Sequence, residues 1–166
     1  MGGYPEREEG MRILKESLFE SLPYFESAVA VLLLENHYPY GYKGLNEPAG
    51  AHGDFLEAFS SVKSPNLGFC LDYGHSHMCG NTAEFIRELS PYLRYTHLAD
   101  NFGDEDAHLP FGEGSVDWAD VLEKTLSAGF GGPFIVEYPA SAETAGRFKS
   151  LLGEIILRRE RCRDNI

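Results

Sequence analysis

This chain of 166 residues has few cysteines, little positive charge and no long apolar run. Its three cysteines, Cys70, Cys79 and Cys162, show no recognisable disulfide spacing, which is typical of reduced thiols in an intracellular protein. The longest apolar run, residues 28–34, is far too short to cross a bilayer. Residues 1–10 are polar and acidic, unlike a secretory signal. These features predict a soluble cytoplasmic protein without a membrane partner.

Positive charge is scarce because 14 Lys and Arg residues face 26 Asp and Glu residues, which gives a formal net charge of −12. Phosphate contacts need Lys and Arg, so this balance argues against nucleic acid and anionic membranes as partners. The hydrophobic content of 43% is enough for a core. The length fits one domain, which we expect to span residues 1–166, since no composition break divides the chain.

Four short apolar runs each lead into a residue that can bind a divalent metal. The runs at residues 29–34, 67–71, 93–96 and 134–136 are followed by Glu35, Asp72, His97 and Glu137. Helical spacing of apolar residues in the intervening segments predicts the order α-(βα)4. Because parallel strands end at the same edge of a sheet, we expect the four side chains to converge there, where α/β folds place their active sites.

The predicted fold class is α/β, a half TIM barrel with parallel strands, because a complete barrel needs about 250 residues. Its first and last strands would have open apolar edges that invite pairing with another chain, so we expect a homodimer through these edges. A helix is expected at residues 6–25. The strand at residues 28–34 is expected to be buried on both faces because its apolar residues are continuous. Asp54 and Asp117 are expected to cap helices, and residues 158–166 to fray.

The four strand-end residues form a hard, oxygen-rich set of three carboxylates and one imidazole. Such a set suits Mn²⁺, Mg²⁺ or Co²⁺ with open positions for substrate, and Zn²⁺ is also compatible. Cysteine is absent from it, which argues against a closed structural zinc site. A metal that bridges the carbonyl and an adjacent hydroxyl of a sugar makes the neighbouring C–H proton more acidic. Glu35 and Glu137, on two sides of the substrate, could then serve as base and acid.

Taken singly, these residues leave alternatives open. Asp72 could bind the metal or cap the turn that follows it. His75 could support a ligand or face the substrate, and we expect His77 to be a surface or core histidine. A lone His97 or Glu137 at a strand end is more often structural, so the metal interpretation depends on the four residues acting together.

The ordered series Leu-Leu-Glu-Asn, Leu-Asp-Tyr-Gly-His, Thr-His-Leu-Ala-Asp, Leu-Pro-Phe-Gly-Glu-Gly-Ser-Val-Asp-Trp and Ile-Val-Glu-Tyr resembles the xylose isomerase-like TIM barrel superfamily. This group holds sugar phosphate isomerases and epimerases, ketose 3-epimerases and endonuclease IV-type AP endonucleases. The resemblance covers nearly the whole chain, but only the carboxyl-terminal half of the family fold.

For the isomerase and epimerase branch, the resemblance implies that the four strand-end residues are metal ligands and that Glu35 and Glu137 also move protons. It implies that His75 contacts substrate and that residues 109–114 form a loop over the site. His108 falls where the epimerases often have a substrate-binding Arg, and we expect it to bind substrate. The leading hypothesis is therefore a divalent-metal-dependent sugar or sugar-phosphate isomerase or epimerase of carbohydrate metabolism.

Two other hypotheses remain. The endonuclease branch has an Asp-x-His pair that binds a further zinc together with the equivalent of His75, and Asp106-Ala107-His108 is similar to this pair. The resemblance thus implies an alternative, an endonuclease IV-like phosphodiester hydrolase with a second metal at His75, Asp106 and His108. The third hypothesis is an inactive, truncated half barrel.

Overall fold

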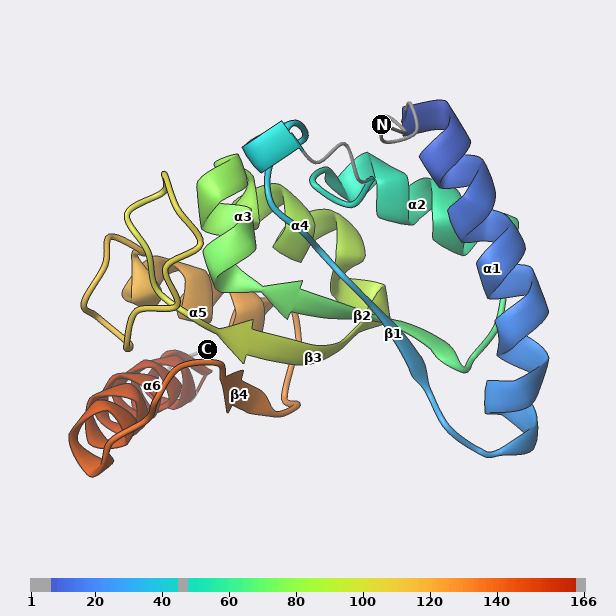
Figure 1. The fold of residues 1–166 in the computed structure, drawn as a ribbon. Helices are drawn as coiled ribbons and strands as arrows, with labels where there is room; N and C mark the ends of the chain where they lie inside the picture. Colours follow the sequence, from blue (N-terminus) through green and yellow to red (C-terminus); the bar gives the residue numbers. More distant parts are fainter. Residues whose placement is uncertain (1–6, 45–47, 164–166) are drawn as a thin grey trace.

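The structure is a computed structural model that describes residues 7–44 and 48–163. Within these residues it contains six α-helices and four strands (Figure 1). They are, in order, α1 (Arg7–Ser27), β1 (Leu32–Glu35), α2 (His52–Ser61), β2 (Leu67–Asp72), α3 (Tyr73–Cys79), α4 (Thr82–Leu89), β3 (Leu93–Leu98), α5 (Trp118–Ser127), β4 (Phe134–Val136) and α6 (Ala142–Arg163). Two 3₁₀ turns, at Tyr42–Gly44 and Ser90–Tyr92, complete the set. The order confirms the predicted α-(βα)4 arrangement, with α3 as an addition.

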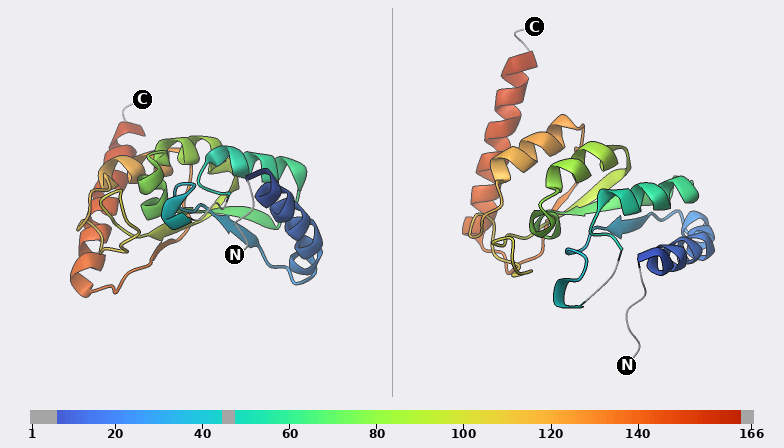
Figure 2. Two further views of the ribbon diagram at one scale, coloured as in Figure 1. Left: turned by 45° about the horizontal axis from the view of Figure 1, so that its top comes forward. Right: turned by 90° about the horizontal axis from the view of Figure 1, so that it is seen from above.

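The four strands form one parallel sheet in the order β1-β2-β3-β4. Each strand therefore lies beside the next one along the chain, which is the connection pattern of a TIM barrel. Figure 2 shows α1, α2, α4, α5 and α6 as a curved layer along the convex side of the sheet, with α1 and α6 at its two ends, while α3 continues from the carboxyl end of β2. This confirms the predicted fold class, an α/β fold compatible with part of a barrel.

The sheet is anchored through its second strand. All six residues of β2 are buried, because it has a neighbour on each side and helices behind it. Phe69 packs its ring against Phe55 of α2 at 4.9 Å and Phe85 of α4 at 5.7 Å between ring centroids. Burying aromatic rings of this size contributes strongly to stability. The core thus fixes the strand from which the candidate site is built.

The first strand is shorter and more exposed than predicted. β1 begins only at Leu32, while Val29 is 90% exposed with a positive φ of 55°, and Val31 is 49% exposed. The expectation of burial on both faces at residues 28–34 was wrong, because β1 is an edge strand with a single neighbour. At the opposite edge, Ile135 and Val136 of β4 are also exposed. The predicted apolar edges are therefore present.

The two expected helix caps had different outcomes. Asp117 is the N-cap of α5 and accepts the backbone N–H of Asp120, as predicted. Asp54 is not a cap, since α2 begins at His52. Instead, its carboxylate accepts the N–H of Ala49 at 2.9 Å and pairs with Arg7 of α1.

The carboxyl-terminal helix is longer than expected. α6 continues to Arg163, so the expectation of fraying from residue 158 was wrong as far as the described residues reach. Arg159 anchors this part by donating to the Leu126 carbonyl at 3.0 Å. Glu6, expected to begin the first helix, and residues 164–166 lie outside the described residues. In the part of the chain that the structure describes, no helix has the length and apolar character needed to span a bilayer.

Candidate metal centre

The four predicted metal ligands come together at the carboxyl edge of the sheet. Glu35 and Asp72 are the last residues of β1 and β2, His97 is the last but one residue of β3, and Glu137 directly follows β4. One ligand atom from each lies within 4.8 Å of the others. Ligand atoms on opposite sides of one cation, at bond lengths of about 2.0–2.4 Å, are separated by roughly this distance. The geometry therefore suits a shared ion.

Asp72 provides an independent test of whether a cation fits. Its side chain is 1% exposed, and its Oδ1 accepts the backbone N–H of His75 at 2.7 Å, which caps α3. Its Oδ2 is buried and has no hydrogen-bond partner among the described residues. Burial raises the pKa of Asp72 to about 6, and the neighbouring carboxylates of Glu35 and Glu137 act in the same direction. A buried carboxylate oxygen without a partner destabilises the fold, and a divalent metal would supply the missing partner of Asp72 Oδ2.

His97 joins two of the carboxylates. Its Nδ1–H donates to Glu35 Oε1 at 2.9 Å, and the same nitrogen lies 3.2 Å from Glu137 Oε1. The hydrogen bond to Glu35 raises the pKa of His97, and this outweighs the opposing effect of burial. The carboxylates of Glu35 and Glu137 thus favour positive charge at this position, where a metal bound to a neutral imidazole would supply it.

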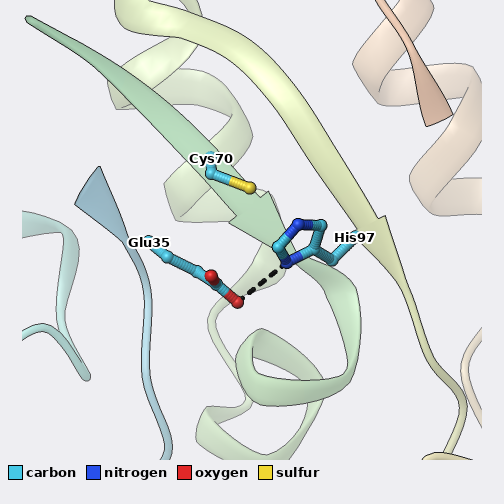
Figure 3. Close-up of side chains that lie close together, drawn as sticks. All are labelled: Glu35, Cys70 and His97. Atoms are coloured by element: carbon cyan, nitrogen blue, oxygen red, sulfur yellow. Dashed lines mark hydrogen bonds and ion pairs between the residues drawn. The ribbon is translucent and has the colours of Figure 1, made fainter. Parts of the chain in front are cut away.

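Cys70 is a neighbour that the sequence interpretation left out of the ligand set. Its Sγ lies within 4.8 Å of ligand atoms of Glu35 and His97. Figure 3 shows the three side chains, from β1, β2 and β3, pointing toward one another. Cys70 precedes Asp72 by two residues, and residues i and i+2 of a strand share a face. This alternation of side chains along the strand could have predicted from the sequence that Cys70 lies near Asp72. Burial and the nearby carboxylates raise the pKa of the Cys70 thiol.

A second cluster lies beside the first. Ligand atoms of His75, Asp106 and His108 are within 4.8 Å of one another. Asp106 lies 3.5 Å from His75 Nε2 and 3.2 Å from His108 Nε2. The two clusters touch because His108 donates from Nδ1 to the Glu137 carbonyl at 2.7 Å. The structure thus brings together all the residues that the sequence suggested for a second site.

Nearby charges and burial shift the pKa of His75 in opposite directions. Burial lowers its pKa, but the interaction with Asp106 and the charge of Asp72 outweigh this effect and raise the pKa to about 9. His75 is only 7% exposed, and its Nδ1–H donates to the Asn36 carbonyl at 2.9 Å. Both ring nitrogens of His75 therefore face protein groups.

The remaining residues singled out in the sequence have local partners. His77 Nε2 lies 2.9 Å from Ser115 Oγ, outside both clusters. In the segment 109–114, Phe111 is buried and its ring packs against Trp118 of α5 and Phe148 of α6. This segment is therefore held against two helices.

Comparisons with known proteins agree on the fold. A family model described as "Xylose isomerase-like TIM barrel" matches residues 1–153. The chain is 38% identical over 85 residues to the uncharacterized protein MJ1311 of Methanocaldococcus jannaschii, which covers 49% of this chain and 29% of that protein.

Two solved structures extend the likeness to nearly all of the chain. A D-tagatose 3-epimerase-like protein is 28% identical with a TM-score of 0.77, covering 96% of this chain and 61% of that one. L-ribulose 3-epimerase is 16% identical with a TM-score of 0.73, covering 99% of this chain and 59% of that one, and supports the fold alone. The chain thus spans less than two thirds of each of these relatives.

Proposed function

The chain belongs to the xylose isomerase-like TIM barrel family, and from that premise we propose that it is a divalent-metal-dependent isomerase or epimerase of a small sugar or sugar phosphate. The observation that carries this proposal is the gathering of Glu35, Asp72, His97 and Glu137 within 4.8 Å, with one Asp72 oxygen buried and unpartnered among the described residues. The likeness to a D-tagatose 3-epimerase-like protein supports the reaction class.

In this proposal the four residues hold Mn²⁺, Mg²⁺ or Co²⁺, with Zn²⁺ as a weaker candidate, because carboxylate oxygens dominate the set. When bound, such an ion polarises the carbonyl and adjacent hydroxyl of a sugar and so acidifies the C–H proton beside the carbonyl. Asp72 and His97 serve as ligands only. The two glutamates also act on the substrate.

Glu35 ends β1 and Glu137 directly follows β4, and these are the two edge strands of the described sheet, so the two glutamates approach the cluster from opposite sides. One carboxylate takes the proton from one face of the carbon next to the carbonyl, and the other returns a proton to the opposite face. Both side chains are about one third exposed, which leaves them accessible to a substrate. His108 is the more exposed of the two proposed substrate-binding histidines, and His75 is the deeper one.

The experiment is solvent exchange in D₂O, followed by NMR over a panel of ketoses, aldoses and their phosphates. With Mn²⁺ present, we expect deuterium to enter at the carbon beside the carbonyl. Glu137→Gln should lower the rate by about 10²–10⁴-fold, because it removes one proton-transfer group and one ligand. The proposal fails if exchange does not depend on added metal, or if Glu137→Gln binds Mn²⁺ and exchanges protons like the native chain.

A second candidate function is an endonuclease-like phosphodiester hydrolase, favoured by the cluster of His75, Asp106 and His108. Each histidine donates its Nδ1–H to a backbone carbonyl and turns Nε2 toward Asp106, an arrangement common in histidines that bind metals. An abasic-site DNA nicking assay with Zn²⁺ tests it, and absence of cleavage would dismiss it. The net charge of −12 weighs against a DNA substrate.

We also propose that a second copy of this chain covers the open edges of the sheet. β1 and β4 each have a single strand neighbour in the described residues. Val31, which directly precedes β1, and Ile135 and Val136 of β4 are exposed. Such edges favour pairing with another chain.

We also propose that the protein is located in the cytoplasm. The three cysteines are free, which fits the reducing conditions there. We further propose a single domain over residues 1–166, because the buried apolar residues in the described part of the chain form one cluster.

A further inference from the structure

Cys70 lies next to the proposed metal ligands but has no part in the reaction proposed above. We propose that Cys70, Glu35 and His97 form a second metal-binding mode for thiophilic divalent ions such as Cd²⁺, which overlaps the oxygen-rich mode and excludes it. The two modes share Glu35 and His97, so one chain can hold an ion in only one of them. The binding inference stands on geometry alone, whereas its consequence for activity rests on the proposed function.

The geometry of the thiol-containing mode is set by the backbone. Cys70 is the register partner of Glu35 in the β1–β2 pair, and His97 lies one strand further along the sheet. The three ligand atoms come from three neighbouring strands and lie within 4.8 Å of one another (Figure 3). Because the strands are hydrogen-bonded in this register, an ion could bind without rearrangement of the sheet.

The local charge balance is the second observation that points to a cation. Asp72 Oδ2 is buried without a partner among the described residues, two residues beyond Cys70 on the same face of β2. Glu35 and Glu137 add two further carboxylates to the same region. A positive ion bound at Cys70 would therefore be attracted by Asp72 and Glu137, even though these two residues are not its ligands.

The chemistry of the ligands separates the ions. Oxygen ligands favour Mg²⁺ and Mn²⁺, whereas thiolate favours soft ions. Binding breaks the S–H bond of Cys70 and forms a sulfur–metal bond, and the thiol proton leaves to solvent without any redox change. Hard ions gain little from a bond to sulfur, so they should bind in the oxygen-rich mode with Asp72 and Glu137 as ligands. Soft ions should bind in the mode that contains Cys70.

The consequence for activity follows from the displacement. An ion bound to Cys70, Glu35 and His97 would use two of the four ligands of the oxygen-rich mode and would not be bound by Asp72 or Glu137. While it is bound, the site cannot bind Mn²⁺. Cd²⁺ should therefore inhibit any Mn²⁺-dependent activity competitively with Mn²⁺. The inhibition should weaken when Cys70 is replaced.

The test uses ultraviolet difference absorption during Cd²⁺ titration of the full chain. The other two thiols are first removed as Cys79→Ser and Cys162→Ser, since one is half-buried and the other exposed, and neither belongs to the cluster. In this background we expect a thiolate-to-cadmium charge-transfer band that saturates near one Cd²⁺ per chain. Adding Cys70→Ala should abolish the band and lower Cd²⁺ affinity by at least about tenfold, while Mn²⁺ affinity changes by less than about twofold.

Two results would overturn the inference: absence of the band in the Cys79→Ser, Cys162→Ser background, or its persistence after Cys70→Ala. Circular dichroism tests whether each variant folds. If Cys70→Ala does not fold, Cys70→Ser replaces it in the same titration. Glu137→Gln separates the two proposals, because it removes a ligand of the oxygen-rich mode only. It should weaken Mn²⁺ binding, whereas the cadmium band should still form at saturating Cd²⁺ because Cys70 is retained. A native chain that shows the band but binds no Mn²⁺ would reject the proposed function and retain this inference.

Discussion

Asn36 binds the backbone of Asp72 through both atoms of its side-chain amide. Its Oδ1 accepts the Asp72 N–H at 2.7 Å, and its Nδ2 donates to the Asp72 carbonyl at 2.9 Å. Asn36 is fully buried and directly follows Glu35. The pair therefore joins the ends of β1 and β2 and fixes the distance between two of the proposed metal ligands.

Asn36→Ala should lower both stability and metal affinity. Loss of two buried hydrogen bonds should reduce the free energy of unfolding by about 2–4 kcal/mol. Because the ends of two ligand-bearing strands lose their connection, Mn²⁺ affinity should fall by about 10–100-fold. Denaturant unfolding and isothermal titration calorimetry measure the two effects.

Asn66 offers a matched control at the other end of the same strands. It donates from Nδ2 to the Ala30 carbonyl at 2.6 Å, far from the ligands. Asn66→Ala should cost about 1 kcal/mol of stability and leave Mn²⁺ affinity unchanged. An equal loss of affinity in both variants would show that Asn36 acts through general stability.

Stability should depend on pH through His75 and Asp106. Since the pKa of His75 is about 9 in the folded chain and 6.5 without its partners, the folded state binds the proton more tightly. The stabilisation is complete below about pH 6.5 and is lost as pH rises through about 9, so the free energy of unfolding should fall by roughly 3 kcal/mol across this window. Denaturant unfolding with a chelator present, at a series of pH values, measures it.

Asp106→Asn should flatten that pH dependence, because it removes the main group that raises the pKa of His75. Asp104 is an exposed acid in the same loop, so Asp104→Asn is the control and should retain the native slope. Equal slopes for the native chain and Asp106→Asn would contradict this assignment.

Asp100 should hold the loop that carries Asp106 and His108. It is fully buried, and its two oxygens accept four N–H groups. These come from Asn101, Gly112, Val116 and the indole of Trp118. Asp100→Asn replaces one acceptor oxygen with a donor, so the free energy of unfolding should fall by about 3 kcal/mol.

Trp118 is the single tryptophan, so its fluorescence reports the unfolding of this region directly. Asp120→Asn is a control on the first turn of α5, where the side chain is about half exposed and pairs only with Lys124 among the described residues. We expect a change below about 0.5 kcal/mol there. A similar small effect for Asp100→Asn would mean that the loop is held by other contacts.

Association through the sheet edges should be sensitive to charge. Static light scattering should give a dimer for the native chain and a monomer for a variant with Val31→Lys and Val136→Lys, since a buried lysine at each edge opposes pairing. Phe102 is also exposed but lies in the loop after β3, so Phe102→Lys should remain dimeric. A well-folded native monomer at working concentration would contradict the proposal.

Most of the fold could be predicted from the sequence, because apolar runs and helical spacing are local signals. The four strand-end residues followed from the same pattern, since parallel strands end at one edge. The helix α3 was missed because it starts immediately after β2 and contains Gly74, a weak helix former. A Cβ at Gly74 would lie 3.0 Å from the Ala99 carbonyl oxygen, so tertiary packing favours glycine there.

The support of the site was less predictable than its ligands. The contact between Asn36 and Asp72 joins residues that are 36 positions apart, and no local sequence pattern predicts it. Cys70 had a usable signal in the alternation of β2, but its proximity to His97 depends on the register of two strands. The exposure of Val31 likewise followed from the position of β1 at the sheet edge.

The central claim is that Glu35, Asp72, His97 and Glu137 share one ion. Anomalous diffraction at the manganese edge, from crystals of the native chain grown with Mn²⁺, tests it most directly. We expect one strong peak within coordination distance of all four side chains, at roughly 2.0–2.4 Å from a ligand atom of each. A peak only between His75, Asp106 and His108, or no peak at the strand ends, would contradict the account.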